Sequence, residues 1–165
     1  MTRFPLAILS LALAAAAMTG SAAAEGLQAP LKFWEGRTES VGTVKLIMKK
    51  AFRTRSIGHG RIRADGSLDL VQRVEEDGKP AKERRWQIHK VGPGRYAGTM
   101  TEAKGPVTID EIGGRYRFRF KMDGGVAVEQ WLTPNPDGKS GTNKVVIKKF
   151  GMTVGRSEGT VRKLN

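Results

Sequence analysis

The 165-residue sequence contains no cysteine. This absence excludes disulfides and thiolate metal sites, so the fold must be held together by ordinary packing. Histidine is almost as scarce. His59 and His89 are the only two, and neither lies at ligand spacing from another histidine or a carboxylate cluster. We therefore expect no metal site.

Recognisable catalytic groups are also scarce. Without cysteine there is no thiol nucleophile, and none of the glycines opens a helix, so no phosphate-cradling loop is expected. His89 falls on the outward-facing positions of its predicted strand. The acidic run Glu75-Glu76-Asp77 lies at a predicted hairpin tip, where solvated charge is usual. We expect no cofactor and no catalytic residues, and we favour a binding or structural role over an enzymatic one.

The N-terminus has the pattern of a secretory signal peptide. Arg3 supplies a positive charge, the run 4–18 is apolar, and Ala22-Ala23-Ala24 supplies the small residues of a cleavage site. The apolar run is shorter than the ~20 residues of a membrane-spanning helix. We expect residues 1–24 to be removed, leaving a periplasmic protein that begins at Glu25.

Acidic residues are few compared with basic ones. The chain has 29 Lys and Arg against 16 Asp and Glu, a net charge of +13, and loss of the leader removes only Arg3 to leave +12. A basic surface suits nucleic acid or an anionic membrane. Export argues against nucleic acid. Two interpretations stay open, contact with anionic envelope lipids and a charge that only keeps the protein soluble.

The clearest secondary-structure signal is the stretch 115–122, with the sequence RYRFRFKM. Apolar and cationic residues alternate throughout it, which is typical of a β-strand with one buried and one solvated face. Turn signals recur from Gly42 onward: Ala64-Asp65-Gly66, Asp77-Gly78, Gly92-Pro93-Gly94, Gly113-Gly114, Asp123-Gly124-Gly125 and Asn135-Pro136-Asp137-Gly138. No helical periodicity of useful length accompanies them. These features predict an all-β antiparallel meander, closed into a barrel or folded as a sandwich.

Two hairpins have a register that the pattern specifies. One is centred on Gly78 and the other on Gly124, and a shift of one residue in either would set apolar groups against charges. The predicted inward pairs are Leu68–Ile88, Leu70–Trp86, Gln72–Arg84, Phe120–Val128, Phe118–Gln130 and Tyr116–Leu132; the outward pairs are Arg73–Glu83, Arg119–Glu129 and Arg117–Trp131.

Several short motifs together resemble an uncharacterised bacterial envelope family whose members have a lipocalin-like β-barrel. In order they are Phe33-Trp34-Glu35-Gly36, Asp77-Gly78, Arg84-Arg85-Trp86, Gly94-Arg95-Tyr96-Ala97-Gly98 and Lys149-Phe150-Gly151. The resemblance implies an up-and-down barrel of about eight to ten strands and no reaction. Many members are lipoproteins with a cysteine at the cleavage site, which this chain lacks, so a soluble protein is expected after export.

The turn signals that begin at Gly42 set the expected domain boundaries, and the resemblance bears on one ion pair. We assign residues 25–41 to a linker in which Phe33-Trp34 could plug one end of the barrel or form an edge of the core, and residues 42–165 to the barrel. A position that is often acidic in the family is Gln72 here. We therefore expect no buried pair between Arg84 and a carboxylate.

Polar residues on predicted inward positions suggest a binding cavity. Buried Arg or Lys is rare unless it is paired or lines a wet cavity. A second interpretation places Arg84 at the barrel mouth, with its stem on Trp86 and its head in water. The candidate ligand-binding residues are Gln72, Arg84, Trp86, Tyr116, Phe118, Phe120, Asn143 and Lys149.

Three functions follow as hypotheses. The first is a periplasmic protein that binds a small apolar or amphipathic, lipid-like ligand, including an anionic one, inside the barrel. The alternative is a structural or interaction module with a filled barrel, whose basic surface contacts anionic components of the cell envelope. An enzyme that uses the cavity is the third.

Overall fold

Alternation in the sequence decides which side chains form the interior. In strand β7 (Arg115–Met122) Tyr116 and Phe118 are buried, whereas Arg115 and Arg119 are exposed. The same two-residue period runs through β3 and β4, because successive side chains of a strand point to opposite faces of the sheet. The structure is a computed structural model that describes residues 30–164.

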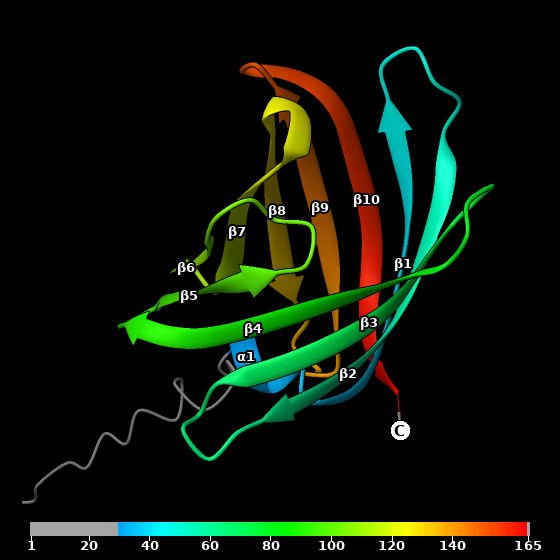
Figure 1. Cartoon of the computed structure of the whole chain (residues 1–165). Helices are drawn as coiled ribbons and strands as arrows, with labels where there is room; N and C mark the ends of the chain where they lie inside the picture. Colours follow the sequence, from blue (N-terminus) through cyan, green and yellow to red (C-terminus); the bar gives the residue numbers. More distant parts are fainter. Residues whose placement is uncertain (1–29, 165) are drawn as a thin grey trace, which may run out of the picture.

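Ten antiparallel strands form one closed barrel (Figure 1). Each strand pairs with its neighbours in the sequence, and β1 pairs with β10 to close the ring. This confirms the predicted all-β up-and-down meander with a lipocalin-like barrel. The strands are β1 (Gly36–Leu46), β2 (Phe52–Ile62), β3 (Leu68–Glu76), β4 (Lys82–Gly92), β5 (Arg95–Met100), β6 (Val107–Ile112), β7 (Arg115–Met122), β8 (Val126–Pro134), β9 (Ser140–Lys149) and β10 (Met152–Leu164).

The barrel begins earlier than expected. Strand β1 starts at Gly36, so residues 36–41, which we had assigned to the linker, belong to the barrel. This segment is polar apart from Val41 and lacks an apolar alternation that would reveal a strand. The predicted signal peptide, residues 1–24, lies outside the described residues.

Both predicted hairpin registers are confirmed. Every predicted inward and outward pair of β3 with β4 and of β7 with β8 occurs as a facing pair. One outward contact differs, because the Arg119 guanidinium pairs with Asp110 of β6 at 2.9 Å rather than with Glu129. Glu129 instead accepts a hydrogen bond from the indole nitrogen of Trp131 at 2.9 Å.

The seam between β1 and β10 carries an ion-pair network on the outer face. Glu39 of β1 accepts hydrogen bonds from Arg162 of β10, with an Nη2–Oε2 distance of 2.6 Å, and from Arg55 of β2 at 2.8 Å. These bonds, first from Arg162 and then from Arg55, hold the pKa of Glu39 below its usual value. One carboxylate thus joins three neighbouring strands.

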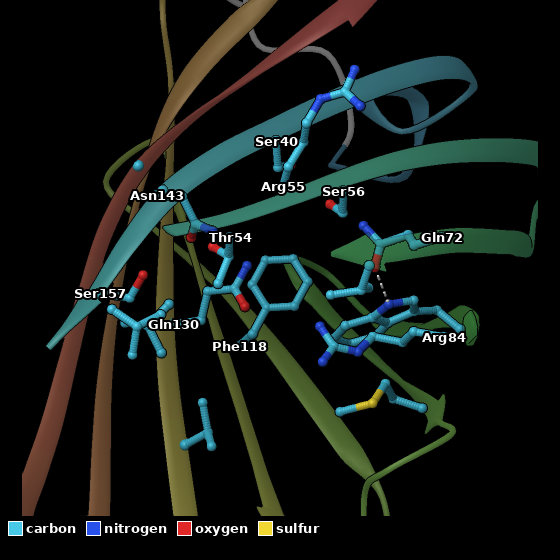
Figure 2. A pocket seen from close by; sticks show the side chains of 18 of the residues that line it. Ser40, Thr54, Arg55, Ser56, Gln72, Arg84, Phe118, Gln130, Asn143 and Ser157 are labelled. Atoms are coloured by element: carbon cyan, nitrogen blue, oxygen red, sulfur yellow. Dashed lines mark hydrogen bonds between the residues drawn. The ribbon is translucent and has the colours of Figure 1, made fainter. Parts of the chain in front are cut away.

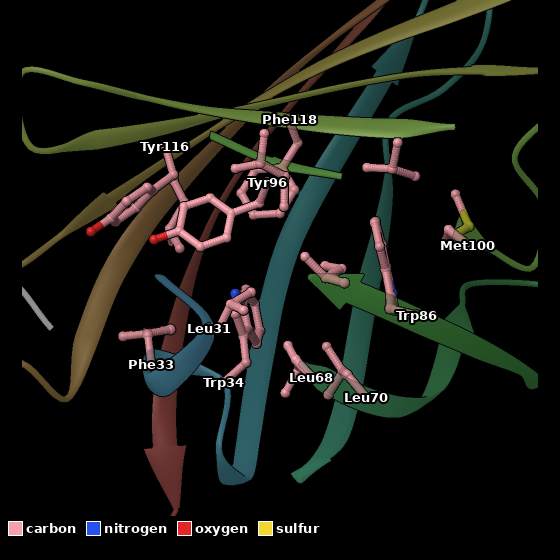
Figure 3. Packing of buried hydrophobic residues seen from close by; sticks show 14 of the residues in the cluster. Leu31, Phe33, Trp34, Leu68, Leu70, Trp86, Tyr96, Met100, Tyr116 and Phe118 are labelled. Atoms are coloured by element: carbon pink, nitrogen blue, oxygen red, sulfur yellow. The ribbon is translucent and has the colours of Figure 1, made fainter. Parts of the chain in front are cut away.

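A short helix plugs one end of the barrel. Leu31 and Phe33 of helix α1 (Pro30–Phe33), together with Trp34 directly after it, belong to the main apolar cluster (Figure 3). The sequence had suggested a plug formed by the aromatic pair Phe33-Trp34. The two rings meet edge to face with centroids 5.4 Å apart. Strand β2 passes so close to the plug that a Cβ on Gly60 would lie 1.9 Å from the Trp34 carbonyl oxygen. This close approach explains why glycine occupies that position.

The hairpin loops divide between two ends. The loops after β2, β4, β6 and β8 lie beside α1, at what we call the closed end. Five loops lie at the opposite, open end: 47–51, 77–81, 101–106, 123–125 (which holds the 3₁₀ turn Asp123–Gly125) and 150–151. Between residues 30 and 164, no helix is long and apolar enough to cross a membrane.

Candidate ligand-binding cavity

A cavity of about 240 Å³ occupies the barrel between the plug and the open end. Its lining reaches from Trp34 of the plug to Met122, near the open end. One part of the wall is aromatic and apolar, and another part is polar (Figure 2). Apolar lining includes Leu70, Trp86, Ile88, Met100, Phe118, Phe120, Val128 and Val145; polar lining includes Ser40, Thr54, Ser56, Gln72, Gln130, Asn143 and Ser157.

Trp86 is fixed at the centre of the aromatic part. Its indole nitrogen donates a hydrogen bond to Gln72 Oε1 at 2.8 Å, between facing residues of β4 and β3. Its ring also packs edge to face against Phe118 and Phe120, with centroids 6.4 and 5.9 Å apart. The indole N–H is therefore satisfied, and the apolar faces of the three rings remain available to the cavity.

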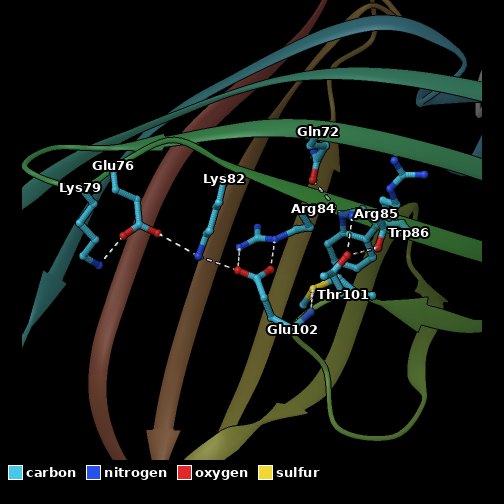
Figure 4. A network of polar contacts seen from close by, with 10 residues as sticks. Gln72, Glu76, Lys79, Lys82, Arg84, Arg85, Trp86, Thr101 and Glu102 are labelled. Atoms are coloured by element: carbon cyan, nitrogen blue, oxygen red, sulfur yellow. Dashed lines mark hydrogen bonds and ion pairs between the residues drawn. The ribbon is translucent and has the colours of Figure 1, made fainter.

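Arg84 does have a carboxylate partner, which corrects our expectation. The partner is Glu102, in the loop between β5 and β6. Its two oxygens accept from Nε and Nη2 of Arg84, the second contact at 3.2 Å (Figure 4). Lys82 Nζ lies 2.6 Å from the same carboxylate. Burial opposes the charged form of Glu102, but these two cations outweigh it and lower its pKa. The Arg84 charge is therefore neutralised locally.

The other cation in the lining, Arg55, directs its guanidinium to the outer face, where it is paired (Figure 2). Arg55 lies 2.8 Å from Glu39 and 3.7 Å from Glu75. At the open-end rim Glu76 accepts Lys79 at 2.5 Å and approaches Lys82 at 3.6 Å, so its pKa falls although burial would raise it. Charges around the cavity are thus largely compensated within the protein.

Six of the eight predicted site residues line the cavity together. They are Gln72, Arg84, Trp86, Phe118, Phe120 and Asn143. Tyr116 does not, and this prediction was wrong. The side chain points inward as expected but is only 1% exposed and lies in the packed closed end, near Tyr96 (Figure 3). Burial, with the nearby Glu111 carboxylate, raises the pKa of Tyr116 to about 12.

Lys149 was also wrongly assigned to the cavity. It shares parity with Asn143 and Val145, but it ends β9 and its side chain is exposed at the open end. Its Nζ lies 5.6 Å from the centre of the Phe150 ring. Parity in a strand gives the face of the sheet but not the depth along the barrel axis, which is why this residue was misplaced.

The polar side chains Ser56, Gln130 and Ser157 were missed. Gln130 could have been found, because the predicted register sets it opposite Phe118. Ser56 and Ser157 lie on β2 and β10, whose registers we did not predict. Asn143 Oδ1 is buried and, among the described residues, has no hydrogen-bond partner. The polar part of the wall thus holds unused hydrogen-bonding capacity.

Ser157 also stands in a Gly-x-Ser-x-Gly sequence, residues 155–159, which we did not identify. A nucleophile elbow of this pattern needs a sharp turn from a strand to a helix. Here the serine lies within the continuous strand β10, and its facing residues are Val44 and Val145. Both histidines are exposed on outer faces. The arrangement therefore supplies no activated serine.

Residues 30–164 also contain no group of three or more His, Asp or Glu side chains that could hold a metal.

The chain belongs to the family described as "Protein of unknown function (DUF3833)", whose model matches residues 10–163. No curated protein sequence matches it. Among solved structures it is similar to the S-type phycobiliprotein lyase CPES from Guillardia theta. That likeness has a TM-score of 0.65 and 12% identity, over 82% of this chain and 90% of the lyase. It is also similar to Rv2717c from M. tuberculosis, with a TM-score of 0.61 and 13% identity, over 83% of this chain and 99% of the other. At these identities the likenesses show the barrel fold.

Proposed function

We propose that this protein binds a small apolar or amphipathic, lipid-like molecule in the barrel cavity after export to the periplasm. The observation that carries the proposal is the two-part wall, with the Trp86, Phe118 and Phe120 rings in one part and hydroxyl and amide side chains in the other. Ligand sites typically combine a largely apolar lining with a few placed polar groups. Apolar burial would supply affinity and the polar groups would set orientation.

The cavity charges favour a ligand with an uncharged polar end. Arg84 is the cation whose side chain reaches the cavity, and it is already paired with Glu102. The Arg55 guanidinium lies on the outer face with Glu39. An anionic headgroup would have to compete with Glu102 for Arg84, and Glu102 already accepts two charge-assisted hydrogen bonds from that guanidinium. This revises our expectation of an anionic ligand.

Hydrogen-bonding groups on the polar side can recognise such a ligand. Asn143 Oδ1 lacks a partner among the described residues, and Gln130 and Ser157 line the same cavity. A ligand hydroxyl or amide would provide a donor for Asn143 after a small rotation of its amide. Satisfying a buried acceptor removes an unfavourable desolvation term, so the ligand gains both affinity and specificity.

Matched substitutions on β9 test the proposal. Val145 lines the cavity, and the adjacent Val146 points to the outer face. Val145→Phe fills the cavity, whereas Val146→Phe adds the same ring outside. We expect the first variant to weaken binding of a neutral apolar fluorescent probe by at least about tenfold, and the second to leave it unchanged.

Binding by the unmodified protein comes first in this experiment. Native mass spectrometry of protein purified from its own host should show a co-purifying molecule that the Val145→Phe variant lacks. If neither probe nor host molecule binds, or if both variants bind equally, the cavity is not a binding site. An interaction module with an unused interior would then be the better description.

Export is tested separately. We expect N-terminal sequencing of the periplasmic protein to begin at Glu25. Recovery of the intact leader in the inner membrane would instead indicate an anchored protein.

A further inference from the structure

Large apolar side chains project into solvent at the open end of the barrel. Ile47 and Met48, in the loop after β1, are 60% and 99% exposed. Phe150 and Met152, at the turn between β9 and β10, are 77% and 68% exposed. We call these four residues the apolar rim. Single exposed apolar residues are ordinary on protein surfaces, but four large ones on two loops at one end of the barrel need an explanation.

Backbone conformation makes two of these residues more unusual. Met48 and Phe150 have φ angles of 59° and 51°, and they are the only described residues other than glycine with positive φ. Phe150-Gly151 is a two-residue hairpin turn in which both residues have positive φ, a position that Asn, Asp or Gly fills with least strain. The chain thus places a bulky apolar side chain where folding alone would favour a small polar one.

The two loops that carry the rim lie on neighbouring strands. β1 pairs with β10, and beyond the end of that ladder the Ile47 N–H donates a hydrogen bond to the Val154 carbonyl at 2.9 Å. Phe150 also packs over the turn after β7, because a Cβ on Gly125 would lie 2.8 Å from its ring. Both loops extend from the same end of the barrel in Figure 1.

Lysines flank the rim in the sequence and in space. Lys49 and Lys50 follow Met48, and Lys148 and Lys149 precede Phe150. All four are exposed, and none makes an ion pair within residues 30–164. The two partly buried carboxylates at this end, Glu76 and Glu102, are already bound to cations of their own. Asp77 and Asp123 also lie in loops at this end. The five open-end loops together with Lys148 and Lys149 hold six lysines and three carboxylates, so the net charge around the apolar rim is positive.

We propose that the apolar rim docks the open end of the barrel on an anionic lipid bilayer. Ile47, Met48, Phe150 and Met152 would enter the boundary between headgroups and acyl chains, and the four lysines would contact lipid phosphates. Short apolar projections ringed by lysines suit a fluid anionic interface. A specific protein partner would need roughly 800 Å² of complementary surface, and two narrow loop tips do not offer a flat area of that kind. Docking in this orientation turns the cavity mouth toward the membrane.

Vesicle co-sedimentation tests the docking, with the closed end as its control. Met48→Ser with Phe150→Asn removes two rim side chains, and Asn suits the left-handed turn position, so the fold should be retained. Val91→Ser with Ile112→Ser removes two exposed apolar side chains, 52% and 38% exposed, at the opposite end. The probes are vesicles of phosphatidylcholine with phosphatidylglycerol, and vesicles of phosphatidylcholine alone.

We expect the unmodified protein to bind the anionic vesicles, to bind the neutral ones weakly and to dissociate as salt rises. The rim variant should lose at least about tenfold in partitioning, and the closed-end variant should lose none. Lys49→Glu should weaken binding more than Lys90→Glu, which changes an exposed lysine near the closed end. Absence of binding by the unmodified protein, or equal losses in the rim and closed-end variants, would overturn the proposal.

Docking does not depend on the proposed cavity ligand, and the variants distinguish the two. The filled-cavity variant Val145→Phe should still bind anionic vesicles. The rim variant should still bind a dissolved neutral probe. Capture of a protein in place of vesicles by the unmodified rim would count against a lipid surface and assign the rim to a protein partner.

Discussion

The two ends of the barrel differ in how the same alternating strands use their inner faces. At the closed end, inward positions carry large apolar side chains, and α1 fills the remaining space. The inward cavity-lining positions of β1, β2, β9 and β10 carry serine, threonine, asparagine, glycine, valine or isoleucine, and a cavity remains. Side-chain size at inward positions, rather than strand topology, thus determines which half is core and which half is open.

Along the barrel axis, the residues that should stabilise the fold lie mainly at the closed end, and those proposed to bind lie toward the open end. Leu68 and Leu132 at the closed end are completely buried, so that end should provide most of the free energy of folding. The open end contains the exposed apolar rim and the left-handed backbone at Met48 and Phe150. Features that cost stability are therefore concentrated where a ligand or a membrane would have access.

The largest effect should come from a cavity created in the closed end. Leu132 is fully buried opposite Tyr116. Leu132→Ala should lower the free energy of unfolding by about 3–5 kcal/mol, because the plugged end cannot collapse to fill the space. Chemical denaturation measures this value. A loss below about 1 kcal/mol would show that the closed end is loosely packed, and the two ends of the barrel would then not differ in packing.

Alkaline titration should detect the closed end through its tyrosines. Tyr96 and Tyr116 are the only two in the chain, and burial raises the pKa of both, that of Tyr116 to about 12. Because the folded-state pKa lies above the unfolded value of about 10, the stabilising effect is complete below that pH and is lost as pH rises toward 12. Tyrosinate absorbance should therefore appear above the usual range, together with loss of structure. Ionisation at the ordinary pKa in the folded protein would contradict this burial.

A smaller effect is expected for a ring in the cavity wall. Phe120 is partly exposed and lines the cavity, with Trp86 packed against its ring. Phe120→Ala should cost about 1–2 kcal/mol, well below the value for a fully buried ring, because one side already faces open space. The same variant should bind a neutral apolar probe less tightly. A cost equal to that of Leu132→Ala would mean that the two halves are packed alike.

The smallest effect should be found on the outer face. Glu129 accepts one hydrogen bond from Trp131 and makes no ion pair among the described residues. Glu129→Ala should change the free energy of unfolding by about 0.5–1 kcal/mol. Thermal unfolding measures the shift. A loss of several kcal/mol would place Glu129 in a role that the observed outer-face contact does not account for.

Much of the fold could be predicted because β-structure leaves a local pattern. The alternation in residues 115–122 and the Asp-Gly turns defined two hairpins and their registers, which the barrel contains. The start of β1 could not be predicted, because residues 36–41 are held by pairing with β2 and β10 rather than by an apolar stripe of their own. Strand pairing between distant segments leaves little trace in either segment alone.

The site was predicted less completely, for two physical reasons. Parity distinguishes inward from outward positions but not depth, so Tyr116 and Lys149 were grouped with Phe118 although they lie at opposite ends. The carboxylate that neutralises Arg84 comes from Glu102, in a loop 18 residues further along the chain. No strand periodicity governs where a loop side chain points, so only the folded barrel brings this pair together.

Closure of the barrel by β1 and β10 has a consequence for the folding pathway. Nine of the ten strand pairings join consecutive strands, so the meander can grow one hairpin at a time at low loop-closure cost. The tenth pairing, which the bond between Glu39 and Arg162 fastens, joins residues 123 positions apart. Until it forms, β1 and the growing end of the sheet expose two unpaired edges that another chain could use. Seam closure should therefore be the slow step, and the interval before it is when the protein is most prone to aggregate.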